Sequence, residues 1–401
     1  MTHAIFRSPL RRKWLTAVLG LVLLVGLTLV ALTGFASHVA YEPRLPGNNT
    51  NPVGGLLESW LVGWPTSPAW LYRVTQGVHV ILGLALVPVV LAKLWSVMPL
   101  LFSWPPVRSV AHGLERLSVF LLVSSTIFEL ATGVLNIQTY YAFPFSFYTA
   151  HYYGAWVFIA TMVLHVALKA GTVRAALRSV VKTGSGDDGD GRAPEQDHPR
   201  PASISRRGLL GAVAGASVTV VALSVGQTLD GPLRRTALLA PRGLSYGPGP
   251  NDFEINKTAA SAGIDPDGAG PGWRLELTGA RTVMLSRAEL LALPQYTYRL
   301  PISCVEGWST NQSWTGVRLA DLARLAGVGD PELVRVESLQ VGGSFGAASL
   351  SARQIADERS LLALRVNGAD LSLDHGFPAR IIVPAAPGVH CTKWVTRMRF
   401  Q

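Results

Sequence analysis

The stretch from Ile302 to Val328 reads ISCVEGWSTNQSWTGVRLADLARLAGV and contains Cys304, one of only two cysteines among 401 residues. A short run that favours a strand precedes the cysteine, and an amphipathic helical piece closes the stretch. No second cysteine lies at C-x-x-C spacing, so a zinc site is not expected. The thiol could be a small core residue, a nucleophile or the ligand of another metal.

The chain on either side of this stretch divides into two kinds of sequence. From about residue 240, short alternating pieces such as WRLELTG and ARIIVPA are separated by Gly and Pro turns, which is typical of a mixed α+β domain. Before about residue 230, long uncharged apolar runs dominate, and 49% of all residues are hydrophobic. Composition therefore favours a membrane part followed by a separate globular part.

Five apolar runs are each long enough to cross about 30 Å of hydrocarbon. We predict an all-α membrane bundle of four spans plus a fifth anchor span, at residues 14–35, 71–97, 114–135, 148–168 and 208–229. The basic residues gather beside these runs and form no stripe with interleaved aromatics. The net charge of +10 therefore indicates positive-inside topology and no nucleic-acid partner. The globular domain is expected outside.

Histidines near the span ends lie at matched predicted depths. His151 and His165 share a face of the fourth span, about 21 Å apart along its axis. We predict an outer level of His79 with His151 and an inner level of His112 with His165. Two imidazoles from different helices suit the axial ligation of a haem b iron at each level. Ordinary interfacial histidines are the alternative.

Through this histidine pattern, residues 14–175 resemble the four-helix haem b subunits of respiratory formate dehydrogenases and hydrogenases, and more loosely the bacterial cytochrome b561 group. In those subunits a first-helix histidine helps to bind the inner haem, whereas the first predicted span has no internal histidine. One or two haems b are therefore expected. Glu129 interrupts the third span, which predicts either proton exchange with a quinone or a solvated position at the interface.

The segment after the bundle contains a linker followed by a sequence that resembles an export signal. Residues 1–175 form the predicted cytochrome b-like domain, and residues 176–204, rich in Gly, Asp and Pro, are expected to be a cytoplasmic linker. Ser205, Arg206 and Arg207 then resemble the start of a twin-arginine export signal, with stop-transfer arginines as the alternative. Without a clear cleavage site, residues 205–230 are expected to stay as an anchor. The predicted location is the bacterial cytoplasmic membrane, with the catalytic domain on the extracytoplasmic side.

Three motifs between residues 240 and 401 resemble the sulfite oxidase family in the family's order. The stretch around Cys304 resembles the molybdenum-binding segment, in which one cysteine thiolate ligates the metal beside the dithiolene of molybdopterin. GPNDFEIN (249–256) and DHGFPARIIVPAAPGVHCTKWVTRM (374–398) resemble two cofactor-binding stretches. The resemblance implies a molybdopterin-binding domain with Cys304 as the catalytic metal ligand. It implies cofactor contacts by Asn251, Glu254, Ile255, Ser338, His375, Arg380, Cys391, Thr392 and Lys393.

One departure from the family bears on the reaction. Vertebrate and plant sulfite oxidases place arginines just after the cysteine to hold an anionic substrate, whereas Glu306 and Trp308 stand in that stretch here. CVEGW is more similar to the periplasmic members that reduce methionine sulfoxide in proteins. We therefore expect a molybdenum oxidoreductase that passes electrons from quinol through haem b and reduces an S-oxide or N-oxide.

Two alternatives remain at this stage. One is a dehydrogenase for sulfite or another small oxyanion that delivers electrons to quinone, and the other is a membrane-anchored scaffold that has lost its chemistry. The expected partners are quinone or quinol, a small or protein-bound S-oxide and the lipid bilayer.

Overall fold

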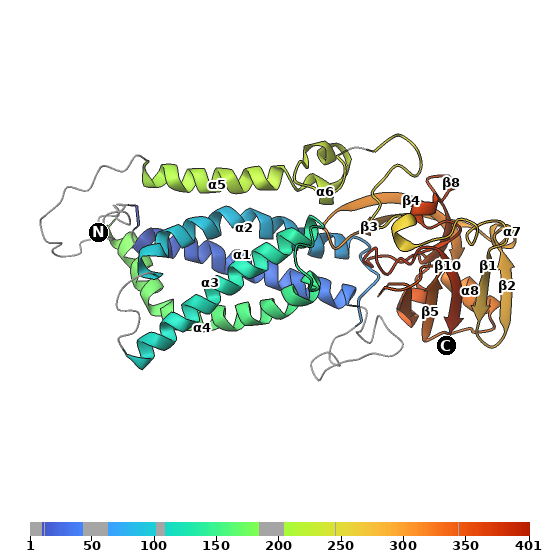
Figure 1. Cartoon of the computed structure of the whole chain (residues 1–401), viewed down its shortest axis with the longest axis horizontal. Coiled ribbons are helices and arrows are strands. Elements are labelled where there is room, and N and C mark those ends of the chain that lie inside the picture. The colour runs from blue at the N-terminus through green and yellow to red at the C-terminus, as the bar shows by residue number, and fades with distance from the viewer. Residues whose placement is uncertain are drawn as a thin grey trace, which may run out of the picture. The chain divides into compact units, whose positions relative to one another are not determined.

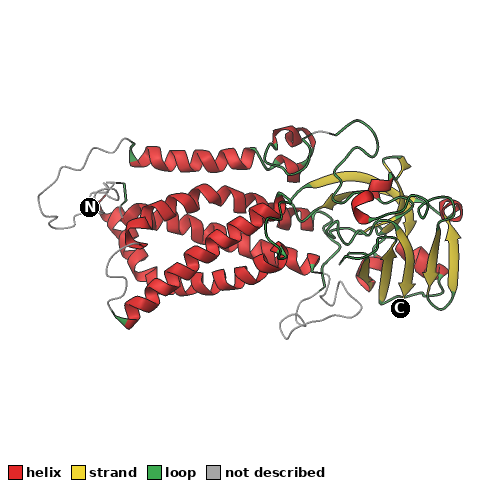
Figure 2. Cartoon of the chain, viewed as in Figure 1, coloured by secondary structure: helices red, strands yellow, loops and turns green. Residues whose placement is uncertain are grey.

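A computed structural model describes residues 10–11, 13–42, 63–101, 109–183, 204–244, 246–343 and 345–401. The chain divides into two compact units: Met1–Ala31 with Val80–Ala222, and Leu32–His79 with Leu223–Gln401. Among the described residues, every strand belongs to the second unit, which also contains the short helices between the strands (Figure 2). The predicted order of a helical bundle followed by a mixed α+β domain is confirmed.

Five helices are long and apolar enough to cross a membrane, as the apolar runs predict. They are α1 (Lys13–Tyr41), α2 (Leu71–Leu101), α3 (Val110–Ile137), α4 (Phe147–Thr183) and α5 (Arg206–Ala222), which the short α6 (Gly226–Leu229) follows (Figure 1). Within the first unit, α1 packs against α2 through Leu19, Leu86 and Val89. Leu86 also contacts α1 at Gly26, where any side chain would clash with it.

Helices α1 and α4 continue well past the ends of the predicted spans. Helix α1 continues past Phe35 to Tyr41 and carries His38 in its last turn, so the first helix contains a histidine that lies beyond the predicted span. Polar residues at this end find partners across the bundle, because the hydroxyls of Ser37 and Thr75 lie 3.2 Å apart. Helix α4 continues through Thr183 into the predicted linker, of which residues 184–203 lie outside the described part of the chain.

Two five-stranded sheets build the second unit. The first has the order β2-β1-β10-β5-β6, with strands β2 (Thr282–Ser286), β1 (Arg274–Thr278), β10 (Val395–Phe400), β5 (Leu333–Ser338) and β6 (Ala347–Ser351). The second has the order β3-β4-β7-β8, with β9 also paired to β7; its strands are β3 (Tyr296–Ser303), β4 (Ser309–Arg318), β7 (Leu361–Val366), β8 (Ala369–Asp370) and β9 (Arg380–Ile382). Short α-helices α7 (Arg287–Ala292), α8 (Leu319–Leu325) and α9 (Ala352–Ala356) connect these strands.

Strand β7 lies between two hydrophobic cores. Leu362 and Leu364 face the core that the two sheets share, whereas Leu361 and Ala363 face a second cluster on the other side of the β3-β4-β7 sheet. This alternation follows from the two-residue period of a strand. The second cluster also contains Cys304 and Cys391. The fold therefore places the predicted site on the sheet face that points away from the shared core.

Candidate active site

Cys304 opens a tight turn, residues 304–308, that joins β3 to β4; we call it the Cys304 turn. The amide of Cys304 donates to the Trp308 carbonyl over 2.9 Å, and the amide of Gly307 donates to the Cys304 carbonyl over 3.0 Å. Gly307 has a φ of 91°, a conformation that favours glycine. The pairing of β3 with β4 therefore fixes the cysteine directly after the buried end of β3.

A second loop, residues 383–394 between β9 and β10, is fastened to the same strand end. The amide of Gly388 donates to the carbonyl of Ser303 over 2.7 Å, and Pro387 forms a parallel bridge with Ser303. Cys391 lies in this loop, and both cysteines are free, buried thiols. The two family-like stretches around Cys304 and Cys391 thus form one site.

The environment of the Cys304 thiol does not favour a free nucleophile. The residue is 5% exposed. Burial, and then the nearby Glu306 carboxylate, raise the pKa of the thiol well above its ordinary value. A neutral buried thiol reacts poorly. A bound metal cation would compensate the thiolate charge, so a metal ligand is the chemical role that this position suits.

Two buried cations lie near the turn without a counterion. Arg380 is 1% exposed and donates to the carbonyls of His375, over 3.0 Å, and Cys391, over 3.3 Å. Lys393 is 8% exposed and donates to the carbonyls of Lys257 and Asp374, each over 2.8 Å. Neither forms an ion pair with a carboxylate in the described part of the chain, and Arg380 Nε has no partner there.

These cations fit an anionic cofactor. Burial lowers the pKa of Arg380 to about 10, and it lowers the pKa of Lys393 well below its ordinary value. A buried charge without a counterion costs free energy that a bound phosphate would offset. The buried hydroxyl of Thr392 also lacks a hydrogen-bond partner among the described residues. Two cations and an unused hydroxyl suit the phosphate of molybdopterin.

Asn251 and His375 form a second part of the site. The His375 ring stacks on Phe253 at 3.7 Å between ring centroids, and its Nε2 lies 2.9 Å from the Asn251 carbonyl oxygen. The Asn251 side chain donates to Asp370 O over 2.9 Å and accepts from Ser372 N over 2.8 Å. Asn251 thus holds the segment that carries His375, and its own amide group is already bonded.

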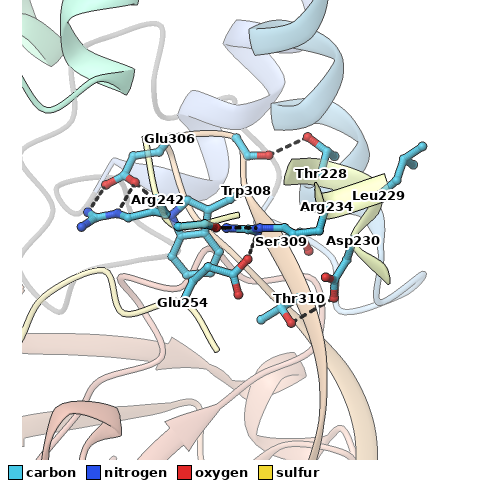
Figure 3. Close-up of polar contacts among 12 residues, drawn as sticks. Thr228, Leu229, Asp230, Arg234, Arg242, Glu254, Glu306, Trp308, Ser309 and Thr310 are labelled. Atoms are coloured by element: carbon cyan, nitrogen blue, oxygen red, sulfur yellow. Dashed lines mark hydrogen bonds and ion pairs between the residues drawn. The ribbon is translucent and has the colours of Figure 1, made fainter. Parts of the chain in front are cut away.

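The other predicted cofactor contacts include two side chains that bond to neighbouring parts of the protein. Ser338 donates to the Lys393 carbonyl over 2.7 Å and so braces the residue that carries the cation. Glu254 forms a buried ion pair with Arg234 (Figure 3), so its carboxylate already has a charged partner inside the protein. Ile255 is half-buried. In contrast, Lys393 interacts electrostatically with both Arg380 and Cys304.

Arg242 is a site residue that the sequence reasoning missed. Its Nε donates to Glu306 Oε2 over 2.8 Å and its Nη2 to Oε1 over 2.6 Å, while Trp308 Nε1 donates to Oε2 over 2.9 Å (Figure 3). Arg242 also interacts electrostatically with Cys304. The two partners are 64 residues apart in sequence, so no local pattern could have revealed the pair.

The predicted haem ligands lie in both compact units. In the first unit, Nδ1 of His151 is 3.1 Å from the Glu129 carboxylate and 3.0 Å from the Thr132 hydroxyl. Glu115 interacts electrostatically with both His112 and His165. In the second unit, the His79 ring packs against α1 at Gly34, where any side chain would clash. The pairing of His79 with His151 stays a prediction.

Two buried histidines should make the domain sensitive to acid. Burial lowers the pKa of His375 to about 3 and that of His390 to about 4, against about 6.5 in an unfolded chain. Between these values the unfolded chain binds protons that the folded chain does not, so stability falls as the pH drops. We expect a loss of about 2.5 kcal/mol per histidine at about pH 4.5.

This loss can be measured as the melting temperature against pH. His390→Gln keeps a donor for the Tyr41 carbonyl, which lies 3.0 Å from His390 Nε2. The variant should reduce the acid dependence by about half. An unchanged slope would show that His390 is not the group being protonated.

Residues 262–401 match the family described as oxidoreductase molybdopterin binding domain. This part of the chain is a sulfite oxidase-type molybdopterin-binding domain. The chain is 32% identical over 131 residues to the uncharacterized oxidoreductase YuiH of Bacillus subtilis, covering 32% of this chain and 65% of that protein. It is 31% identical over 170 residues to human mitochondrial sulfite oxidase, covering 34% of this chain and 30% of that protein. It thus spans less than two thirds of either relative.

Part of the chain also aligns with a solved structure. Sulfane dehydrogenase SoxCD from Paracoccus pantotrophus aligns with a TM-score of 0.30 and 25% identity, over 32% of this chain and 38% of that one. The predicted recognition of the domain is confirmed, as is its assignment to the oxidoreductases.

Proposed function

We propose that the protein is a membrane-bound oxidoreductase that takes electrons from quinol through haem b and reduces a neutral S-oxide or N-oxide such as methionine sulfoxide. Molybdopterin, when bound, supplies two-electron oxygen-atom exchange with the substrate. In the net reaction, quinol and sulfoxide give quinone, thioether and water. The quinol loses two electrons and two protons, the S–O bond breaks, and the oxygen leaves as water.

The preference for a neutral oxide is carried by the ion pair beside Cys304. Glu306 cancels the charge of Arg242 with two hydrogen bonds, so an anionic substrate would meet a carboxylate at the Cys304 turn. No bond to the described residues uses Arg242 Nη1. We assign that N–H to the oxygen of the substrate, because a polar S–O group accepts hydrogen bonds without carrying a net charge.

The remaining site residues take binding roles in this proposal. Cys304 holds the metal through its thiolate, and Arg380, Lys393 and Thr392 hold the phosphate of the cofactor. His375 stays neutral near neutral pH, because burial lowers its pKa to about 3, and it can exchange a hydrogen bond with the pterin without adding charge.

Haem b is proposed from the histidine arrangement. Since Nδ1 of His151 faces Glu129 and Thr132, iron would bind at Nε2, and the carboxylate would orient the ring as in other metal-bound histidines. His112 and His165 would hold an inner haem. His38 on the extended α1 adds a further imidazole for the outer end.

The proposed membrane is the bacterial cytoplasmic one, with the catalytic domain outside. Five apolar helices support a membrane protein. The Ser205, Arg206 and Arg207 triplet at the start of α5 supports export by the twin-arginine route. That route carries folded domains and would allow the cofactor to be inserted before export.

Glu306→Gln should shift selectivity towards anions. The amide keeps the size of the side chain but leaves the Arg242 charge uncompensated, which is worth about 1.4 kcal/mol, or tenfold, for a bound anion. We expect sulfite or sulfate to inhibit sulfoxide reduction about tenfold more tightly, while the KM for sulfoxide changes less than about threefold. Inhibition constants measure this. Glu337→Gln, which disturbs a pair with Arg397 on β5 and β10, is the matched control. Equal effects on anion and sulfoxide would contradict the specificity role.

The reaction direction is tested with detergent-solubilised, full-length protein. Molybdenum content is measured first, since folded protein without molybdenum would favour the scaffold alternative. The haem b absorbance is then followed after reduction with a quinol analogue. Reoxidation by methionine sulfoxide supports the proposal. Reduction of the oxidised protein by sulfite would instead establish the dehydrogenase, which the similarity to sulfite oxidases makes the second candidate.

A further inference from the structure

The Cys304 turn is fastened to helix α2 within the second compact unit. Gln76, which is 6% exposed, donates through Nε2 to the carbonyl of Val305 over 2.5 Å. Val305 directly follows Cys304 in the turn. A side chain from the outer end of a membrane helix therefore contacts the backbone beside the metal ligand.

A second contact holds the other end of the turn. The hydroxyl of Thr228, on α6, donates to the Gly307 carbonyl over 2.6 Å (Figure 3). Arg73 on α2 in turn donates to the carbonyls of Thr228, over 2.7 Å, and Leu229. Thr228 lies so close to Gly77 that any side chain at that glycine would clash with it. The turn, α6 and α2 are thus joined by hydrogen bonds and by close packing.

His79 lies on the same helical segment. It follows Gln76 by three residues, so both side chains project from neighbouring positions of one helix face, about 4.5 Å apart along the axis. Ala69, just before α2, packs against the hydrophobic cluster that contains Cys304. The helix that carries a proposed haem ligand is therefore the helix that touches the metal-binding turn.

We propose that Gln76 and Thr228 are positioning residues that hold the Cys304 turn against α2. We call this contact between the turn, α6 and α2 the junction. Electrons enter the catalytic domain through the junction, without a diffusible carrier. The inference rests on the proposed function, in which quinol is the two-electron reductant and the S-oxide the oxidant. Electron tunnelling slows exponentially with distance, so loosening the junction slows transfer while leaving both ends intact.

Gln76→Leu and Thr228→Val test the junction, because each removes the donor at nearly constant volume. In full-length detergent-solubilised protein reduced with a quinol analogue, haem reoxidation by methionine sulfoxide should slow at least tenfold in the double variant. Turnover driven by reduced viologen should fall by a much smaller factor than haem reoxidation, because Cys304 and the cofactor-binding residues are retained, and the haem spectrum should be unchanged. Gln295→Leu and Thr219→Val are controls, since within the described part of the chain their side chains bond to the carbonyls of Leu290 and Leu293 and of Gly215, all within five residues in sequence.

Backbone amide exchange provides a readout that needs no haem. In the double variant, the peptide containing residues 303–309 should exchange at least tenfold faster than in the controls. Unchanged exchange together with wild-type haem reoxidation would overturn the proposed junction. If sulfoxide does not reoxidise the haem in the unmodified protein, the proposed function fails, and the exchange measurement still decides whether the turn is anchored by α2 and α6.

Discussion

Cys304→Ser is expected to reduce viologen-driven turnover at least about 1,000-fold, equivalent to about 4 kcal/mol of transition-state stabilisation. A serine hydroxyl is a hard, weakly acidic group and replaces the soft thiolate poorly as a ligand of this metal. The substitution changes the side-chain volume little, and Cys304 bonds to Trp308 and Gly307 through its backbone atoms, which serine retains. The domain should therefore fold. Turnover and molybdenum content per protein are the measurements.

Cys391→Ser is the matched control for this variant. Cys391 is 3% exposed and lies in the same hydrophobic cluster as Cys304, so serine meets a similar environment at both positions. The backbone carbonyl of Cys391 accepts a bond from Arg380, and substitution preserves that contact. Its turnover should stay within about threefold of wild type, about 0.6 kcal/mol. Wild-type turnover in Cys304→Ser with full molybdenum content would refute the ligand assignment.

Arg380→Met should stabilise the cofactor-free protein and abolish cofactor retention. The lowering of its pKa to about 10 corresponds to a burial cost of about 3 kcal/mol for the charge. Two hydrogen bonds to carbonyl oxygens return about 1 kcal/mol each, so methionine should gain about 1 kcal/mol in the cofactor-free state. In the proposed site, the same substitution removes a group that would bind the phosphate of the cofactor.

The effect of Arg380→Met on stability should therefore change sign when the cofactor is present. This is tested by measuring melting temperatures of protein produced in hosts with and without molybdopterin synthesis. The unmodified protein should melt higher with cofactor, whereas Arg380→Met should melt at the same temperature from both hosts. Arg299→Met, at an exposed position of β3, should change neither value. A lower melting temperature of cofactor-free Arg380→Met would mean that the Arg380 charge is already compensated inside the protein.

The sequence predicted the fold and much of the site because those features are local. Uncharged apolar runs predict membrane helices directly, and the Cys304 and Cys391 stretches carry residues that β3, β9 and the loops after them bring together. The prediction ended the first helix too early, because Ser37 and His38 look polar in isolation. Their environment in the bundle, which the sequence does not display, allows the helix to continue.

The contacts that sequence reasoning could not supply are those between distant segments. Arg242 pairs with Glu306, and Gln76 bonds to Val305 across 229 residues of chain. Neither pair follows a helical or strand period. Glu254, a motif position expected at the cofactor, also forms an ion pair with Arg234 that no local pattern predicts.

The compact unit that holds the active site is assembled from two separate pieces of chain, Leu32–His79 and Leu223–Gln401. Trp64 and Thr66 supply hydrogen-bond partners to Ala385 and Arg359 from the earlier piece. A recombinant fragment cut after the last membrane helix would therefore leave part of its own packing surface bare. During biogenesis, the catalytic domain can complete its packing only when the earlier piece of the chain, Leu32–His79, packs against it.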